Sequence, residues 1–314
     1  MVRSAAAALL AATTAAIAAG APVLAVEHGG SWRVWWRSDS APAAWPAELP
    51  AVARAITWRT ASPGLEWGEL RLSGSGEAWR IRVIVARLDP RLHHLRLESP
   101  PPGKGPPNRW TVDHAPADAA LALNAGQFGA AGAWGWVVRD GIERQAPGRG
   151  PLAAAVVVGR DGSFRIVPSD SIAAERATGR VAEAFQSYPA LLDGDGVVPE
   201  PIRAAGNGVD LEHRDSRLAI GELRDGRMLV ALTRFEGLGG VLDNLPFGLT
   251  TPEMAAVMGA LGARRAVLLD GGISSQMILR AGEETHAWRG IRYVPLGLSA
   301  TSRREAAASV RDHR

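Results

Sequence analysis

The chain has 314 residues, of which 46% are apolar and 21% charged, a mixture typical of a folded globular protein and not of a disordered one. Its 35 basic and 32 acidic residues leave a net charge of +3 without a dense basic run, so the charge pattern does not predict nucleic-acid binding. The absence of cysteine excludes disulfides, thiolate metal sites and a cysteine nucleophile.

The first 25 residues have the pattern of a secretory signal peptide. Arg3 supplies a positive charge, residues 5–19 form an alanine-rich apolar stretch, and residues 23–25 (VLA) fit a small-residue cleavage site. The apolar stretch is short and weakly hydrophobic for a permanent membrane helix. We therefore expect a periplasmic or secreted protein with no stable membrane span once residues 1–25 are removed. The sequence does not indicate an oligomeric state.

A tryptophan-rich segment with the first strands follows at residues 26–79. Residues 31–50 contain Trp32, Trp35, Trp36 and Trp45. Exposed indole rings could stack on sugars, but we expect a strand and a proline-rich connection whose rings pack on the domain.

The middle of the chain predicts short strands joined by tight turns. Apolar and polar residues alternate, and Asp-Gly turns recur between the strands. The segments with this pattern are 68–72, 80–89, 120–129, 134–143, 152–167, 184–198 and 217–233. Such turns indicate antiparallel or mixed pairing.

One helix is clearly predicted, starting near residue 251. Thr251 or Thr250 is its N-cap, Pro252 lies in the first turn, and an apolar stripe follows at Met254, Val257, Met258 and Leu261. Gly262 predicts its end. The next run, AVLLDGG (266–272), reads as a buried strand that ends in an acid and two glycines. The expected fold class is α+β, a mixed and largely antiparallel sheet packed by a few helices.

Five motifs, taken in chain order, resemble the phosphodiester glycosidase family. They are LNAGQF (123–128), GWVVRDG (135–141), FQSYPALLDGDG (185–196), RLAIGELRDGRMLVALT (217–233) and LTTPEMAAVMGALGARRAVLLDGGISSQM (249–277). The resemblance implies a catalytic domain over residues 80–300, with a charged tail at 301–314. It also implies an exported hydrolase that cleaves the C1–O–phosphate bond of a sugar-1-phosphodiester, such as a GlcNAc-1-phosphodiester glycoconjugate or an envelope glycopolymer.

This activity needs a carboxylate at the sugar, a cation at the phosphate and neutral donors for hydroxyls. Asp270 is our candidate carboxylate, the alternative being a turn acid. Arg217 is our candidate for the phosphate, the alternative being a structural ion pair. Asn124 would bind a sugar hydroxyl or the phosphate, the alternative being a local cap.

The remaining candidates support these three. Ser274 and, less strongly, Ser275 would bind the phosphate, Arg214 would add positive potential, and Gln186 is a weaker polar candidate. Gly126, Gly271 and Gly272 would shape the backbone.

Leu218, Ile273 and Tyr188 stand where the family often has other residues, which bears on sugar specificity and activity. The sequence identifies no cofactor, and a divalent cation at the acidic pocket stays an open alternative. A non-catalytic glycan-binding envelope protein on the same scaffold is the competing interpretation.

Overall fold

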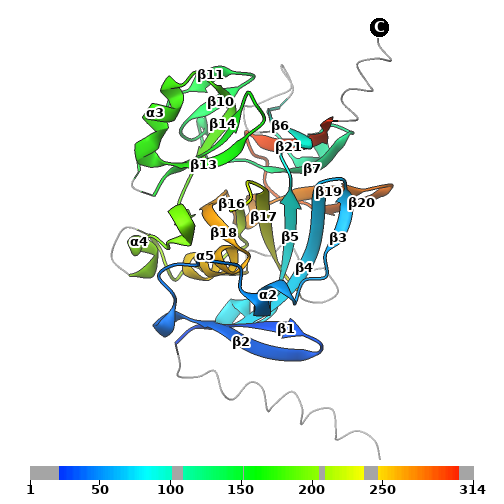
Figure 1. Ribbon diagram of the computed structural model, residues 1–314, viewed down its shortest axis with the longest axis vertical. Coiled ribbons are helices and arrows are strands. Elements are labelled where there is room, and N and C mark those ends of the chain that lie inside the picture. Colours follow the sequence, from blue (N-terminus) through cyan, green and yellow to red (C-terminus); the bar gives the residue numbers. More distant parts are fainter. Residues whose placement is uncertain (1–20, 101–108, 151, 205–208, 237–246, 304–314) are drawn as a thin grey trace, which may run out of the picture.

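The computed structural model describes residues 21–100, 109–150, 152–204, 209–236 and 247–303 (Figure 1). Its strands form three main sheets, and all their pairings in the described residues are antiparallel. The α+β class expected from the sequence is therefore confirmed.

The largest sheet has nine strands in the order β15-β18-β16-β17-β5-β4-β1-β2, with β3 also pairing with β4. These strands are β1 (Val23–His28), β2 (Ser31–Arg37), β3 (Arg59–Ser62), β4 (Leu65–Gly74), β5 (Ile81–Leu88), β15 (Ala190–Leu192), β16 (Leu218–Leu223), β17 (Met228–Phe235) and β18 (Ala263–Leu268). It combines the N-terminal strands β1 to β5 with β15 to β18 from the second half of the chain.

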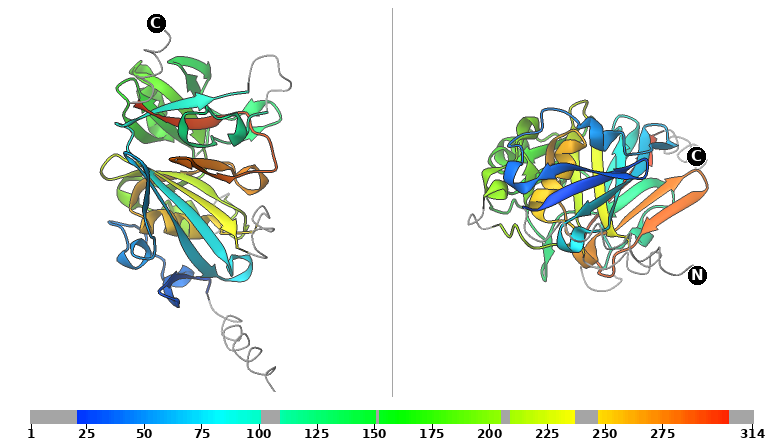
Figure 2. Two further views of the ribbon diagram at one scale, coloured as in Figure 1. Left: turned by 90° about the vertical axis from the view of Figure 1, so that its right-hand side faces the viewer. Right: turned by 90° about the horizontal axis from the view of Figure 1, so that it is seen from below.

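Two five-stranded sheets lie on one side of the large sheet (Figure 2, left). One has the order β11-β10-β14-β12-β13, from β10 (Val137–Arg139), β11 (Ile142–Gln145), β12 (Ala154–Gly159), β13 (Phe164–Pro168) and β14 (Val181–Ser187). The other has the order β20-β19-β7-β21-β6, from β6 (His93–Glu98), β7 (Ala119–Asn124), β19 (Met277–Ala281), β20 (Glu284–Trp288) and β21 (Gly297–Ser302). β8 (Phe128–Gly129) and β9 (Gly132–Ala133) form a separate ribbon. One hydrophobic core fills the space between the three sheets.

Four α-helices complete the described chain: α2 (Pro50–Ala53), α3 (Ile172–Ala177), α4 (Glu200–Arg203) and α5 (Thr251–Ala260). Thr250 caps α5, because its side chain accepts from the Glu253 N–H while Glu253 reaches back to the Thr250 N–H. Gly262 ends the helical segment with φ = +90°, as expected. No described helix has the length and apolarity needed to cross a bilayer.

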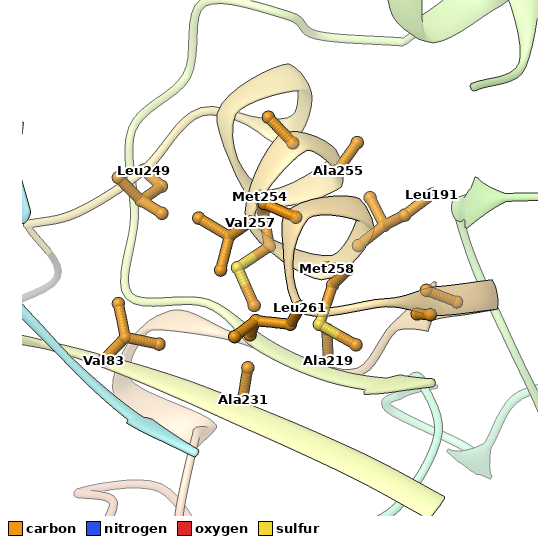
Figure 3. Close-up of a cluster of buried hydrophobic side chains, with 14 of the residues drawn as sticks. Val83, Leu191, Ala219, Ala231, Leu249, Met254, Ala255, Val257, Met258 and Leu261 are labelled. Atoms are coloured by element: carbon orange, nitrogen blue, oxygen red, sulfur yellow. The ribbon is translucent and has the colours of Figure 1, made fainter. Parts of the chain in front are cut away.

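A second core lies beneath the large sheet, around α5. Met254, Val257, Met258 and Leu261 form the predicted stripe and contact Ala219 and other residues of the sheet (Figure 3). The helix is buried on nearly every side, because the N-terminal segment covers the face turned away from the sheet. Fixing α5 in this way fixes the start of β18, which follows it directly.

The N-terminal segment packs on the domain, as expected. Trp36 and Trp45 are buried, Trp35 packs against the core, and only Trp32 of the four is exposed. The boundary at residue 80 is not a structural one, since β4 and β5 pair over eight residues across it.

The end of the predicted signal peptide at residue 25 stays a prediction, and the position of β1 bears on it. Residues 1–20 lie outside the described residues, but β1 begins at Val23 and its Leu24 is fully buried between β2 and β4. Cleavage after Ala25 would remove Leu24 from the core. The charged tail also lies outside the description from residue 304 onward.

Candidate active site

The order of three strands brings the candidate site together. β18 lies between β15 and β16 and runs antiparallel to both. The end of β18 therefore meets the starts of its two neighbours. Asp270 follows β18 by two residues, Tyr188-Pro189 precedes β15, and Arg217 immediately precedes β16. Across these strand ends, which form one edge of the sheet, the order is thus Tyr188, Asp270, Arg217.

A cavity of about 790 Å³ opens at this edge. Its volume lies in the range of small-molecule sites. The lining residues are Gln127, Trp134, Arg149, Gly150, Leu152, Ala153, Tyr188, Pro189, Val209, Asp210, His213, Asp215, Arg217, Thr251, Leu268, Leu269, Asp270 and Gly271. Of the ten side chains and glycines nominated from the sequence, Asp270, Arg217 and Gly271 line it.

Asp270 is held by backbone contacts from two directions. Its N–H donates to the Gly126 carbonyl at 3.1 Å, and the preceding Leu269 N–H donates to the Leu218 carbonyl at 2.9 Å. Burial raises the pKa of the Asp270 carboxyl above its ordinary value, while a hydrogen bond from Ser274 and the charge of Arg292 oppose that increase. A carboxyl with a raised pKa in a cavity is typical of acid–base sites.

Arg217 presents its guanidinium to the cavity, where the carboxylates of Asp215 and Asp210 act on it electrostatically. Its Nε donates to the Leu249 carbonyl at 2.9 Å and its Nη2 to the His213 carbonyl at 2.6 Å. Within the described chain its guanidinium forms no ion pair within 4 Å, and Nη1 has no hydrogen-bond partner. Two fixed carbonyls orient the fork, and its charge stays available for an anion.

Arg214, by contrast, does not contribute to this cavity. Its guanidinium forms a bidentate pair with the buried Glu253, at 2.6 and 2.9 Å. It lines a different cavity, between the N-terminal segment and α5. The expectation that it adds positive potential beside Arg217 is wrong, because a fully buried carboxylate already neutralises it.

Asn124 lies under the cavity floor and not in it. It is fully buried; its Nδ2 donates to the Asp270 carbonyl at 2.9 Å, and its Oδ1 accepts from the Gln276 N–H at 2.9 Å. Both the Nδ2 and the Oδ1 of this amide hold the 270–276 loop. The expected contact with a sugar hydroxyl or phosphate is therefore replaced by a positioning role.

The other polar candidates are also buried supports. The Ser274 side chain forms a hydrogen bond with Asp270 but does not line the cavity. The Ser275 hydroxyl forms a hydrogen bond with that of Ser216 at 3.0 Å and accepts one from the buried Arg234 at 2.8 Å. Gln186 accepts from Trp136 N–H at 2.9 Å and Gly148 N–H at 2.8 Å, and donates to the Gly148 carbonyl at 3.1 Å. None of the three lines the cavity.

The two glycines after Asp270 are needed for close packing. A Cβ on Gly271 would lie 2.5 Å from the Ser216 carbonyl oxygen. Gly272 has φ = +57°, and its Cβ would lie 2.7 Å from the Asp215 carboxylate. Side chains there would push the loop off the β16 end of the cavity.

The residues that sequence reasoning missed include a second acid and a second cation. Asp215 lines the cavity, and burial raises its pKa against the opposing charge of Arg217. Arg149 lines the cavity from an exposed loop. Asp215 lies between the two arginines of HRDSR, a signal that was available in the sequence. The described residues contain no group of three His, Asp or Glu side chains arranged to hold a metal ion.

Three positions depart from the family's usual residues, and only Tyr188 of them lines the cavity. Leu218 is fully buried in the core between the sheets. Ile273 is 42% exposed and lines a separate hollow with Ile291 and Tyr293. Ile273 therefore does not obstruct the cavity.

Comparisons with known proteins identify the family of the chain. The model of the phosphodiester glycosidase family matches residues 117–301, more than half of the chain. The chain belongs to the phosphodiester glycosidase family. This membership confirms the resemblance drawn from the five motifs, although the match begins later than residue 80.

Two solved structures share the fold. The catalytic domain of zebrafish N-acetylglucosamine-1-phosphodiester alpha-N-acetylglucosaminidase aligns with a TM-score of 0.58 and 18% identity, over 79% of this chain and 87% of that one. A hypothetical protein from Synechocystis aligns with a TM-score of 0.54 and 16% identity, over 91% of this chain and 69% of that one. The search of curated proteins finds no match to the sequence.

Proposed function

We propose that this protein is an exported hydrolase that cleaves the C1–O bond of a sugar-1-phosphodiester. The observation that carries the proposal is the meeting of Asp270 and Arg217 at one edge of the sheet, on adjacent strands that border one cavity. Family membership gives the class of reaction. Export rests on the N-terminal sequence pattern alone.

In the proposed reaction a water oxygen bonds to C1 of the sugar and the bond from C1 to the phosphate oxygen breaks. The bonding electron pair leaves with the phosphomonoester, and Arg217 stabilises its negative charge. Asp270 accepts the proton of the water and offsets the positive charge that develops at C1. A phosphomonoester is a good leaving group, so this scheme needs no strong acid at the leaving oxygen.

The end of the cavity near Arg217 is suited to the phosphate. Arg217 donates to the Leu249 carbonyl just before α5, and Thr251, the first residue of α5, lines the same cavity. Arg149 also lines the cavity, next in the chain to Gly148, and has no ion-pair partner in the described chain. The positive charge of Arg217 favours the ionised forms of Asp210 and Asp215.

The test is hydrolysis of GlcNAc-1-phosphomethyl ester, with related sugars and both anomers in the same panel. We expect release of free sugar and methyl phosphate by the wild type, and a loss of about 10²–10⁴-fold in kcat/KM for Asp270→Asn. Asp39→Asn, at an exposed acid away from the cavity, is the matched control. Sugar-phosphate binding without turnover by any of these proteins would favour the non-catalytic glycan-binding alternative.

A further inference from the structure

The cavity contains a pair of aromatic rings that the reaction scheme does not use. Trp134 and Tyr188 both line it, with ring centroids 4.9 Å apart and an interplanar angle of 76°. Tyr188 is 47% exposed, although a large aromatic side chain gains by burial. An exposed ring at the mouth of a cavity is free to cover a ligand.

The backbones of Trp134 and Tyr188 share one hydrogen-bonding partner. Gln127, which also lines the cavity, accepts the Trp134 N–H through its carbonyl at 2.8 Å. Its side-chain amide donates to the Tyr188 carbonyl at 3.2 Å. One residue therefore ties together the two backbone segments that carry the rings.

The Trp134 ring also rests against a glycine. A Cβ on Gly148 would lie 2.8 Å from the Cζ2 atom of Trp134. Gln186 ties both the N–H and the carbonyl of Gly148, so this backbone cannot easily withdraw. The buried amide nominated from the sequence as a substrate ligand thus supports the wall on which a substrate would lie.

The strand order places Tyr188 relative to Asp270 and Arg217. Tyr188 precedes β15, Arg217 precedes β16, and Asp270 follows β18 between them. Two strand spacings separate the outer positions, roughly 10 Å. Tyr188 and Arg217 therefore lie on opposite sides of the candidate carboxylate.

We propose that Trp134 and Tyr188 form a stacking wall for the sugar ring of the substrate, and that the substrate lies with its sugar at this wall, C1 over Asp270 and phosphate at Arg217. The ligand class is a pyranose with an apolar C–H face. Its C–H groups are attracted to the negative face of an aromatic ring, and its hydroxyls stay free for polar partners. The orientation rests on the proposed function, whereas the binding of a sugar by the wall does not.

Binding of sugar-1-phosphates and of inorganic phosphate separates the two ends of the cavity. The probes are GlcNAc-1-phosphate, glucose-1-phosphate, mannose-1-phosphate and inorganic phosphate, titrated by calorimetry against Tyr188→Ala, Trp134→Ala and the wild type. We expect each wall variant to weaken at least one sugar phosphate about 2- to 12-fold, the range for single aromatic contacts, and to leave phosphate binding unchanged. Tyr188→Phe keeps the ring and should bind like the wild type.

Gly148→Ala and Trp79→Ala are the matched controls. Gly148→Ala displaces the Trp134 ring without removing it and should weaken the same sugar phosphate. Trp79 is 51% exposed and meets Phe235 edge-on at 5.5 Å, away from the cavity, so Trp79→Ala should change nothing.

The outcomes for the wall and for the proposed function are distinct. If the wild type hydrolyses the methyl ester while Tyr188→Ala and Trp134→Ala keep their affinity for every sugar phosphate, the wall is refuted and the proposed function stands. If no ester is hydrolysed but the wall variants selectively lose sugar-phosphate affinity, the wall stands and the proposed function fails. Loss of inorganic phosphate binding in the wall variants, or no preference of the wild type for sugar phosphates over phosphate, overturns the wall.

Discussion

A substitution of Asn124 distinguishes a structural role of this side chain from a catalytic one. Replacing it with alanine removes both hydrogen bonds of the buried amide and leaves the Asp270 carbonyl and the Gln276 N–H without their side-chain partner. A buried polar group that loses its partner costs about 1–3 kcal/mol. Two such groups predict that Asn124→Ala lowers the free energy of unfolding by about 2–6 kcal/mol, a large share of the total for an ordinary domain. Activity should fall as well, because the loop that carries Asp270 is released.

Urea denaturation of Asn124→Ala and Asp270→Asn gives the measurement, with the same slope required for both variants and the wild type. Asp270→Asn should keep or increase stability, since burial disfavours its carboxylate. Asn124→Ala should lower the free energy of unfolding. If Asn124→Ala unfolds within 0.5 kcal/mol of the wild type while its activity falls as far as that of Asp270→Asn, the clamp is refuted and Asn124 acts on the substrate.

Three further predictions follow from the contacts. Arg217→Met should abolish competitive inhibition by inorganic phosphate, and Arg217→Lys should restore only part of it, because lysine lacks the fork; equal inhibition of all three proteins would rule out a phosphate role. Burial raises the pKa of Glu183 to about 7 from an ordinary 4.5, so the unfolded state ionises first as pH rises. The free energy of unfolding should therefore fall by about 3 kcal/mol between pH 4.5 and values above 7, a loss that Glu183→Gln should not show in denaturation at a series of pH values. Mass spectrometry of the exported protein should find an N-terminus before Val23, because β1 carries Leu24 into the core; a mature chain beginning at Val26 would contradict this.

The fold could be predicted well where local chemistry decides it. Alternating apolar and polar residues around an Asp-Gly turn predict hairpins such as 152–167. The structure pairs β12 with β13 there. The start of α5 followed from Thr250, Pro252 and Glu253. The order of strands in the large sheet did not follow, because it depends on contacts between residues far apart in the chain. The placement of β1 was missed for the same reason, since a small-residue motif at 23–25 looks the same in a cleavage site and in a strand.

Of the charged residues nominated from the sequence, Asp270 and Arg217 line the cavity and Arg214 does not, and neither nominated amide lines it. Asp270 follows a buried strand and Arg217 precedes one. Residues at such positions lie where the strands of a sheet end, whichever strands are paired. Asn124 and Gln186 offer the same donors and acceptors to a ligand as to a backbone, so sequence alone cannot assign them. The structure assigns both to backbone partners. The Trp134–Tyr188 pair could be found only from the structure, which brings the two residues together at one cavity.

The most direct test of the account is which bond breaks. GlcNAc-1-phosphomethyl ester is hydrolysed by the wild-type protein in heavy-oxygen water, and mass spectrometry locates the label. Attack at C1 beside Asp270 predicts the heavy oxygen in the C1 hydroxyl of the released sugar and none in methyl phosphate. Label in the methyl phosphate would show cleavage of the P–O bond and would contradict the assignment of Asp270 to the sugar and Arg217 to the leaving phosphate.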